Sequence, residues 1–276
     1  MIILHTRLIV KQKQASPLNI RHISLNLEWI YNYSIIFKRR TDMNLGYGYG
    51  MYYFDYSYIF VIIGILLTAA ASMYLNSIYA KYSRISARAS YTPADVARII
   101  LKENGIEDVA IGEVPGSLTD HYIPSKNVLN LSDTTRMSHS IAAYGVAAHE
   151  VGHALQDAQN FAPLSLSIKI APTVSLASQI AIPIIFIGLI LGYARLFNIG
   201  IMAFSLTLLY QLVTLPVEFD ASNRAIAELS RLKLLDEDEL YGVKKVLFAA
   251  AMTYVAAAAS TLLQILRFVS LSRRRD

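Results

Sequence analysis

The 276-residue sequence contains no cysteine, which excludes disulfide bonds and thiolate metal sites. Any zinc ion would therefore be held by histidine and carboxylate side chains. Charged residues are also scarce, at 16%, whereas 54% of the residues are hydrophobic. This balance is typical of a membrane protein rather than of a soluble domain.

The formal net charge of +5 comes from the first fifty residues alone. Residues 1–50 contain seven Lys or Arg and two Asp or Glu, which leaves eighteen of each class in residues 51–276. The body of the protein is thus neutral and lacks the basic surface on which nucleic-acid binding depends. We expect no nucleic-acid partner.

Residues 1–50 show no sustained helical or strand period and no signal-peptide pattern. We expect this extension to lack a fixed structure and the native chain to start at Met43 or Met51. An additional amphipathic anchor is the alternative interpretation.

Four apolar stretches are long enough to cross a bilayer as helices. They cover about residues 58–75, 180–197, 199–215 and 247–269. The second and third are separated only by a turn near residues 195–200, which predicts a helical hairpin in the membrane. The fold class is therefore a mainly α membrane protein with about four transmembrane helices and a small α+β zinc-peptidase domain at the membrane face.

Basic residues give conflicting indications of the orientation in the membrane. Lys81, Arg84 and Arg88 follow the first span and favour a cytoplasmic location for the next segment. The tail Arg273–Arg275 would lie on the opposite face if all four spans cross. We expect the active site to face the cytoplasm.

Between the first two spans the sequence predicts a small mixed region. Thr92 and Pro93 open a helix that should end at Gly105. The alternating segments DVAIGEV (108–114) and NVLNLS (127–132) suggest a hairpin. An extended substrate could lie along Val128 to Leu131, although ordinary sheet packing explains these two residues equally well.

These patterns divide the chain into six parts. They are the extension (1–50), transmembrane helix 1 (51–80), a zincin-like catalytic segment that ends in an apolar linker after Gln159 (81–178), the transmembrane hairpin (179–216), a third-ligand helix with a solvated helix (217–246), and transmembrane helix 4 with the basic tail (247–276).

The segment HEVGH, from His149 to His153, carries the chemistry. Two histidines four residues apart lie on one face of a helix, where both imidazoles can bind one zinc ion. Glu150 between them has the place of the general base in metallopeptidases.

A catalytic zinc needs a third protein ligand. The HExxHxxGxxH arrangement is excluded because Gln156 and Gln159 occupy its glycine and third histidine positions. The ligand must be a more distant carboxylate, and Glu218 is the best candidate because it follows the membrane hairpin on the same face. Asp220 and Glu228 are alternatives.

The sequence resembles the bacterial membrane-bound neutral zinc metallopeptidases of the YugP type. The similarity runs from about residue 51 to 275 and rests on MYYFDYSY, LTDHYIPSKNVLNLS, SIAAYGVAAHEVGHALQ, LVTLPVEFDASNRA and TYVAAAA. The layout is more remotely similar to that of HtpX and CAAX-prenyl endopeptidases, which carry an E-x-x-x-D motif whose glutamate binds zinc. The resemblance implies a zinc-ligand role for Glu218, with Ser222 in place of the final Asp.

The family implies a multi-pass enzyme of the bacterial cell membrane that holds one Zn²⁺ per chain and cleaves polypeptides, including membrane or unfolded proteins. We therefore expect a gluzincin-like zinc endopeptidase in which Glu150 is the general base. A non-cleaving zinc-holding scaffold and a small transporter with an accidental HExxH are the competing hypotheses. Candidates for a substrate contact or oxyanion donor are His121, Tyr122, His139 and Asn223.

Overall fold

The structure, a computed structural model, describes residues 55–273. The predicted extension and the proposed start sites at Met43 and Met51 lie outside this range. The elements follow in the order α3 (Tyr58–Tyr82), α4 (Pro93–Glu103), β1 (Ala110–Val114), β2 (His121–Ile123), η1 (Pro124–Lys126), β3 (Val128–Ser132), α5 (Asp133–Arg136), α6 (Ile141–Ala158), α7 (Ala162–Leu191), α8 (Ala194–Arg231) and α9 (Glu237–Ser272).

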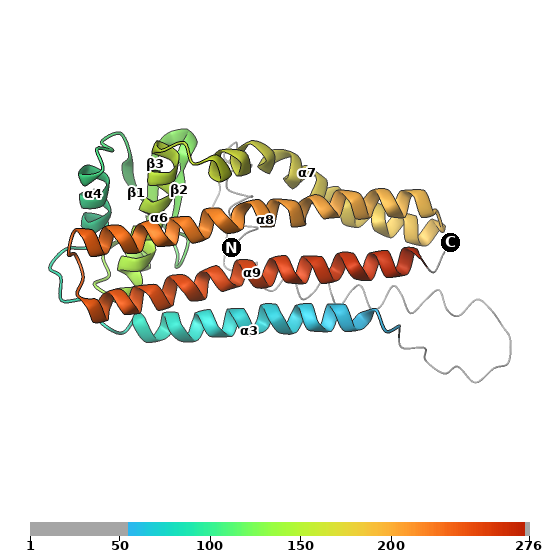
Figure 1. The fold of residues 1–276 in the computed structure, drawn as a ribbon, viewed down its shortest axis with the longest axis horizontal. Helices are drawn as coiled ribbons and strands as arrows, with labels where there is room; N and C mark the ends of the chain where they lie inside the picture. The colour runs from blue at the N-terminus through green and yellow to red at the C-terminus, as the bar shows by residue number, and fades with distance from the viewer. Residues whose placement is uncertain (1–54, 274–276) are drawn as a thin grey trace.

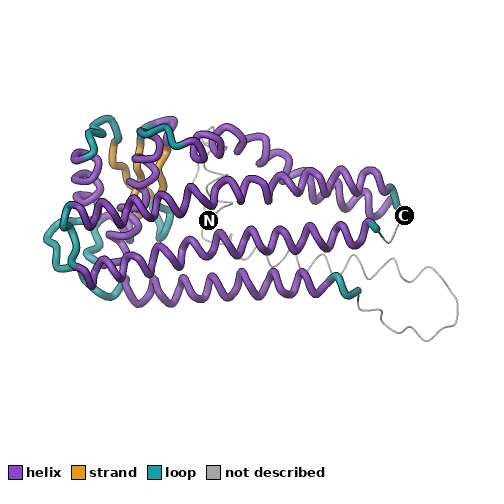
Figure 2. The backbone as a smooth tube through the Cα atoms, viewed as in Figure 1, coloured by secondary structure: helices purple, strands orange, loops and turns teal. Residues whose placement is uncertain are grey.

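Within the described residues, four helices are long and apolar enough to cross a membrane, namely α3, α7, α8 and α9. They run side by side, with α9 between α3 and α8 (Figure 1). Large apolar side chains such as Leu66, Leu191 and Met202 are exposed on their outer faces, where lipid would cover them. The remaining helices and the strands gather at one end of the four long helices (Figure 2).

The long helices extend beyond the predicted spans. The expected linker after Gln159 is wrong, because α7 already begins at Ala162 and continues through Pro172 and Pro183. The hairpin turns at Gly192, earlier than predicted, and the glycine adopts φ +66° there. This left-handed backbone is accessible to glycine without a steric penalty.

The polar segments after the hairpin are not separate helices. α8 continues without interruption from the membrane hairpin through Glu218 to Arg231. In the same way, α9 joins the predicted solvated helix to the last span. Each of these helices therefore connects the membrane region directly to the region at its end.

The predicted hairpin of residues 108–114 and 127–132 is wrong. These segments form β1 and β3, which pair in parallel, with Ala110 opposite Val128. The short strand β2 lies between them in the sequence and pairs with β3 in antiparallel fashion, giving the order β1-β3-β2. β3 is thus the central strand, so the idea that Val128 to Leu131 offers a free edge is also wrong.

Local signals placed α4 correctly. The Thr92 hydroxyl accepts a hydrogen bond from the Asp95 amide at 3.1 Å, and the Asp95 carboxylate accepts one from the Thr92 amide at 3.1 Å. This capping box fixes the start of the helix. Its apolar face packs on α6 in a core that contains Ile100 of α4, Tyr144 of α6 and Leu129 of β3, together with residues of α8 and α9. α6 therefore lies at the centre of the region that carries the HExxH residues.

Candidate metal centre

α6 carries His149, Glu150 and His153 near its middle. The helix begins after Ser140, whose hydroxyl accepts a hydrogen bond from the Ala143 amide at 3.3 Å. Most of its residues are buried, including Glu150 and His153. The two imidazoles stand close together, with ring centroids 4.8 Å apart and planes at 82°. Their four-residue spacing thus produces the shared face that the sequence predicts.

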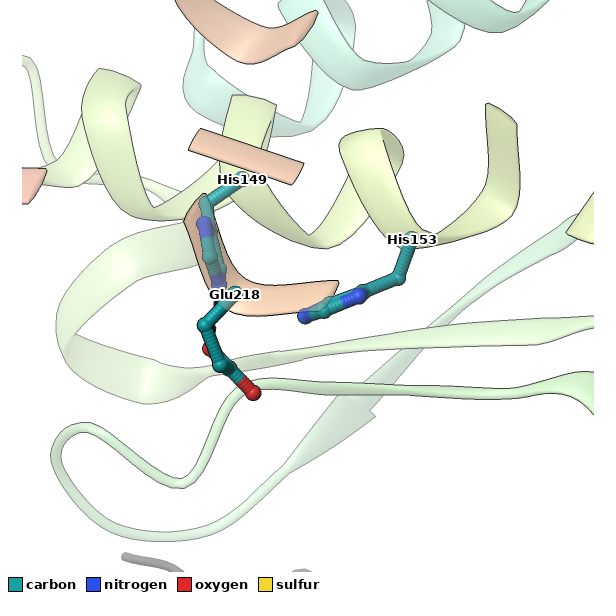
Figure 3. A group of neighbouring side chains, drawn as sticks. All are labelled: His149, His153 and Glu218. Carbon is teal, nitrogen blue, oxygen red and sulfur yellow. Dashed lines mark ion pairs between the residues drawn. The ribbon is translucent and has the colours of Figure 1, made fainter. Parts of the chain in front are cut away.

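Glu218 approaches the two histidines from α8. Its Oε2 lies 3.4 Å from Nε2 of His149. Potential ligand atoms of His149, His153 and Glu218 all lie within 4.8 Å of one another. Figure 3 shows the two histidines projecting from one helix toward the glutamate of the other. The structure therefore brings together residues as far as 69 positions apart in the sequence, His149 and Glu218.

This arrangement fits a tetrahedral zinc ion. Two imidazole nitrogens and one carboxylate oxygen are a common ligand set of catalytic zinc, which keeps a fourth position for water. Ligand atoms about 2.1 Å from a tetrahedral ion are roughly 3.4 Å from one another. The distance of 3.4 Å from His149 to Glu218 matches this geometry, and the three ligand atoms together, within 4.8 Å of one another, would have to draw closer around a bound ion.

Each histidine has a partner at its other ring nitrogen. Nδ1 of His149 lies 3.2 Å from the Ser222 hydroxyl, and Nδ1 of His153 lies 3.0 Å from Oε1 of Gln156. The Gln156 amide in turn donates to the Val217 carbonyl and to Asp220, both at 2.8 Å. These contacts hold both rings through Nδ1, so Nε2 is the atom that each imidazole would offer to a metal.

Glu150 is held beside the histidines by the sheet. Its Oε2 accepts a hydrogen bond from the backbone amide of Tyr122 in β2, at 3.0 Å. Burial raises the pKa of Glu150 to about 7; His149 and the Tyr122 amide lower it, whereas Asp120 and Glu218 raise it. A carboxyl group with this pKa can both accept and release a proton near neutrality.

A glycine allows α6 and α8 to approach at this site. A Cβ atom at Gly152 would lie 2.4 Å from the carbonyl oxygen of Ala221, far inside van der Waals contact. The glycine of the HEVGH segment therefore permits the close crossing that brings Glu218 to the histidines.

The metal centre lines a cavity with walls from several elements. His149, Glu150, His153, Glu218 and Ser222 are among the residues that line it. The other walls come from α3, α9 and the loop before β2. One of the α9 residues is Tyr254, a buried side chain that interacts with Glu218 and Glu150. The cavity is therefore built jointly by the HExxH region and by helices that are candidates to span the membrane.

Most of the secondary candidates lie away from the cavity. Both ring nitrogens of His121 are engaged, by the Thr119 carbonyl at 2.8 Å and by Asn130 at 3.0 Å. The Tyr122 hydroxyl donates to Asp157 at 3.0 Å, so this residue meets the site only through its backbone. His139 and Asn223 are exposed.

The alternative ligands and the two strand residues also lie outside the site. Asp220 accepts from Gln156 and Arg224, and Glu228 pairs with Arg231 at 2.7 Å. Neither belongs to the cluster around the two histidines. Val128 and Leu131 lie in the central strand and do not line the cavity.

Comparison with known proteins identifies the family. The family described as "Putative neutral zinc metallopeptidase" matches residues 57–273, nearly all of the described chain. The chain belongs to this family. Among curated proteins, "Putative membrane protease YugP" of Bacillus subtilis (strain 168) is 46% identical over 200 residues, which cover 72% of this chain and 88% of that protein. No solved structure matches the chain significantly.

The sequence suggested the three candidate ligands but not the groups that contact them. Gln156 was notable in the sequence only because it stands where other zinc peptidases have a glycine. Tyr254 lies in an alanine-rich stretch that indicates no more than helix packing. The amide of Tyr122 has no signature at all, because backbone donors are placed by the fold.

Proposed function

We propose that this protein is a membrane-embedded zinc-dependent endopeptidase. His149, His153 and Glu218 are its metal ligands, and Glu150 is the general base. The main support for this proposal is that potential ligand atoms of the three side chains lie within 4.8 Å of one another, in the cavity that a buried glutamate also lines. Membership of a family described as zinc metallopeptidases supports the same reaction.

A zinc ion in this position would lower the pKa of a bound water and polarise the scissile carbonyl. The residues of the chain supply the remaining functions. Ser222 and Gln156 hold the two imidazoles in place. The Tyr122 amide holds one oxygen of Glu150, which leaves the other free to take a proton from the attacking water and pass it to the leaving amine.

The substrate class is polypeptide, and the environment is a lipid bilayer. A scaffold that binds zinc without cleaving is the rival function. Such a scaffold does not require a buried carboxylate held beside the metal ligands, whereas a peptidase needs one as its proton-transfer base.

The decisive experiment uses the full chain purified in detergent. Zinc per chain is measured by inductively coupled plasma mass spectrometry, and cleavage of casein is followed with and without a chelator. We expect one zinc per chain and chelator-sensitive cleavage. The variant His153→Ala should lose both. Zinc binding without cleavage would support the scaffold, and absence of zinc would overturn the metal site.

We also propose that the metal centre faces the cytoplasm of a bacterial cell, because Lys81, Arg84 and Arg88 lie at its end of α3. The absence of native cysteines makes a clean test possible. Single cysteines are introduced at exposed positions, Ser230→Cys near the metal centre and Tyr193→Cys in the turn of the hairpin. An impermeant maleimide should label only Tyr193→Cys in intact cells, and the reverse pattern would overturn the orientation.

A further inference from the structure

The cavity at the metal centre has a second face that the reaction itself does not use. Besides the site residues, Asp120 and the phenols of Tyr79 and Tyr254, it is lined by apolar side chains, including Leu75 of α3, Val246, Leu247 and Ala250 of α9, and Leu118 of the loop before β2. A bound polypeptide must place the side chains beside its scissile bond somewhere in this space. This apolar face is the part of the cavity that remains available to them.

Among the residues that the structure describes, only one charged side chain besides the site residues lines the cavity, and it is already hydrogen-bonded. Apart from the ligands and Glu150, the charged residue lining the cavity is Asp120. Its carboxylate already accepts hydrogen bonds from the Ser132 amide at 2.7 Å, the Ser132 hydroxyl at 2.8 Å and the Thr135 hydroxyl at 3.1 Å. A glutamate entering here would be repelled by this carboxylate, and a lysine would lose its hydration for a carboxylate that already accepts three hydrogen bonds.

Leu118 is held in the cavity wall against its backbone preference. Its φ of 53° lies in the left-handed region, which is unfavourable for leucine. Neighbouring contacts maintain the loop, since the Gly116 amide donates to Asp133 at 3.0 Å and Thr134 lies 3.2 Å from the Ser117 hydroxyl. Backbone strain of this kind is concentrated at ligand-binding sites.

The apolar face has room for a side chain and lies close to the predicted hydrocarbon region. Ala250 is half-buried and its small side chain leaves room in the wall. Leu75 stands at the end of the uncharged apolar run of α3, and Leu247 stands at the start of that of α9. The apolar face therefore lies where these helices leave the predicted hydrocarbon region.

We propose that this face is a specificity subsite for one bulky apolar side chain next to the scissile bond, in a polypeptide cut at the membrane boundary. The inference rests on the proposed peptidase function. Leu118 and Ala250 are its specificity-determining residues, because one forms a wall and the other leaves the space that the substrate side chain fills.

The test compares cleavage of peptides that differ at one residue beside the cut. Mass spectrometry of casein fragments first locates the cuts, and fluorogenic peptides then carry Leu, Ala or Lys on either side. On one side, kcat/KM should be roughly tenfold higher for Leu than for Ala, and lower still for Lys. In Ala250→Leu the preference for Leu over Ala should disappear, with zinc per chain unchanged.

Ala257→Leu is the matched control, because Ala257 is a half-buried alanine on the same helix that does not line the cavity. It should keep the native preference. Leu118→Gly is the second variant, since glycine tolerates the left-handed backbone and the loop should still fold. It should reduce the preference for Leu several-fold without lowering the Tm.

Binding gives a readout that does not depend on turnover. In a Glu150→Gln background, the Leu peptide should bind about tenfold more tightly than the Ala peptide, and Ala250→Leu should abolish the difference. Cleavage without an apolar preference, or a preference unchanged in Ala250→Leu, would overturn the subsite and leave the peptidase intact. A wild-type protein that cleaves nothing would overturn both.

Discussion

The hydroxyl of Ser222 lies 3.2 Å from Nδ1 of His149, one helical turn after Glu218 on α8. A single helix thus provides both the carboxylate at Nε2 of this histidine and the partner at its other nitrogen. When Nε2 binds a metal, Nδ1–H donates to the Ser222 oxygen. The serine therefore takes the position of the final carboxylate in the E-x-x-x-D pattern and still orients the ring.

Ser222→Ala should weaken zinc binding about tenfold to a hundredfold, because the His149 ring loses the partner that fixes its tautomer and direction. Zinc affinity is measured by competition with a chromogenic chelator. Ser222→Thr keeps the hydroxyl and should restore most of the affinity. Ser230→Ala, an exposed serine on the same helix, is the control for general effects on α8. Equal affinity in Ser222→Ala and the wild type would remove the positioning role.

Glu150→Gln should keep zinc and reduce kcat by about 10²- to 10⁴-fold, because the amide cannot accept the proton of the attacking water. Zinc content and the rate of casein cleavage are measured on the same preparation. The amide can still accept the Tyr122 hydrogen bond, so the fold is expected to survive. Cleavage at the wild-type rate would assign the base to another residue.

Gly152→Ala should separate α6 from α8, because the added methyl group would lie 2.4 Å from the Ala221 carbonyl oxygen. Overpacking of this kind costs about 1–3 kcal/mol of stability. We expect a lower Tm and loss of the metal, since Glu218 can no longer reach the histidines. Ala154→Gly tests helix propensity at a nearby position of α6, and it should lower stability while retaining zinc. Full zinc occupancy in Gly152→Ala would show that the crossing is not tight.

Zinc affinity should fall as the pH falls. Burial alone would lower the pKa of His149, but its contact with Glu218 and the charge of Glu150 hold it above the usual value. A raised pKa means that protons compete with the metal at this nitrogen up to a higher pH, and zinc binds only after the proton has left. Below that pKa, each unit of acidification should reduce the apparent affinity about tenfold. Chelator competition between about pH 5.5 and 8 measures the slope, and a flat profile would contradict it.

Signals confined to a few neighbouring residues predicted several elements correctly. The four-residue spacing of His149 and His153 placed both on one face of α6. Thr92 and Pro93 marked the start of α4 because a capping box and an N-terminal proline act within one turn. The apolar stretches located the four long helices, since the length of such a run directly reflects the thickness of a bilayer.

Contacts between residues far apart in the sequence could not be predicted from such local signals. The parallel pairing of β1 and β3 requires an intervening segment to fold away, and two alternating segments alone resemble a hairpin. The hydrogen bond from Gln156 to Asp220 crosses between two helices and has no local pattern. Glu218 could be proposed as a ligand because the hairpin returns the chain to its starting side, but its distance from His149 follows only from the crossing at Gly152.

The continuity of α8 ties the proposed metal centre to the membrane. Because the helix that carries Glu218 is continuous with a candidate membrane span, and because α3 and α9 wall the same cavity, no soluble fragment of this chain could retain a complete reaction centre. A fragment of residues 83–161 would lack Glu218 and the walls that α3 and α9 contribute. Under the proposed function, the site can act only while anchored in the bilayer, and the polypeptides it cleaves would have to reach the bilayer surface.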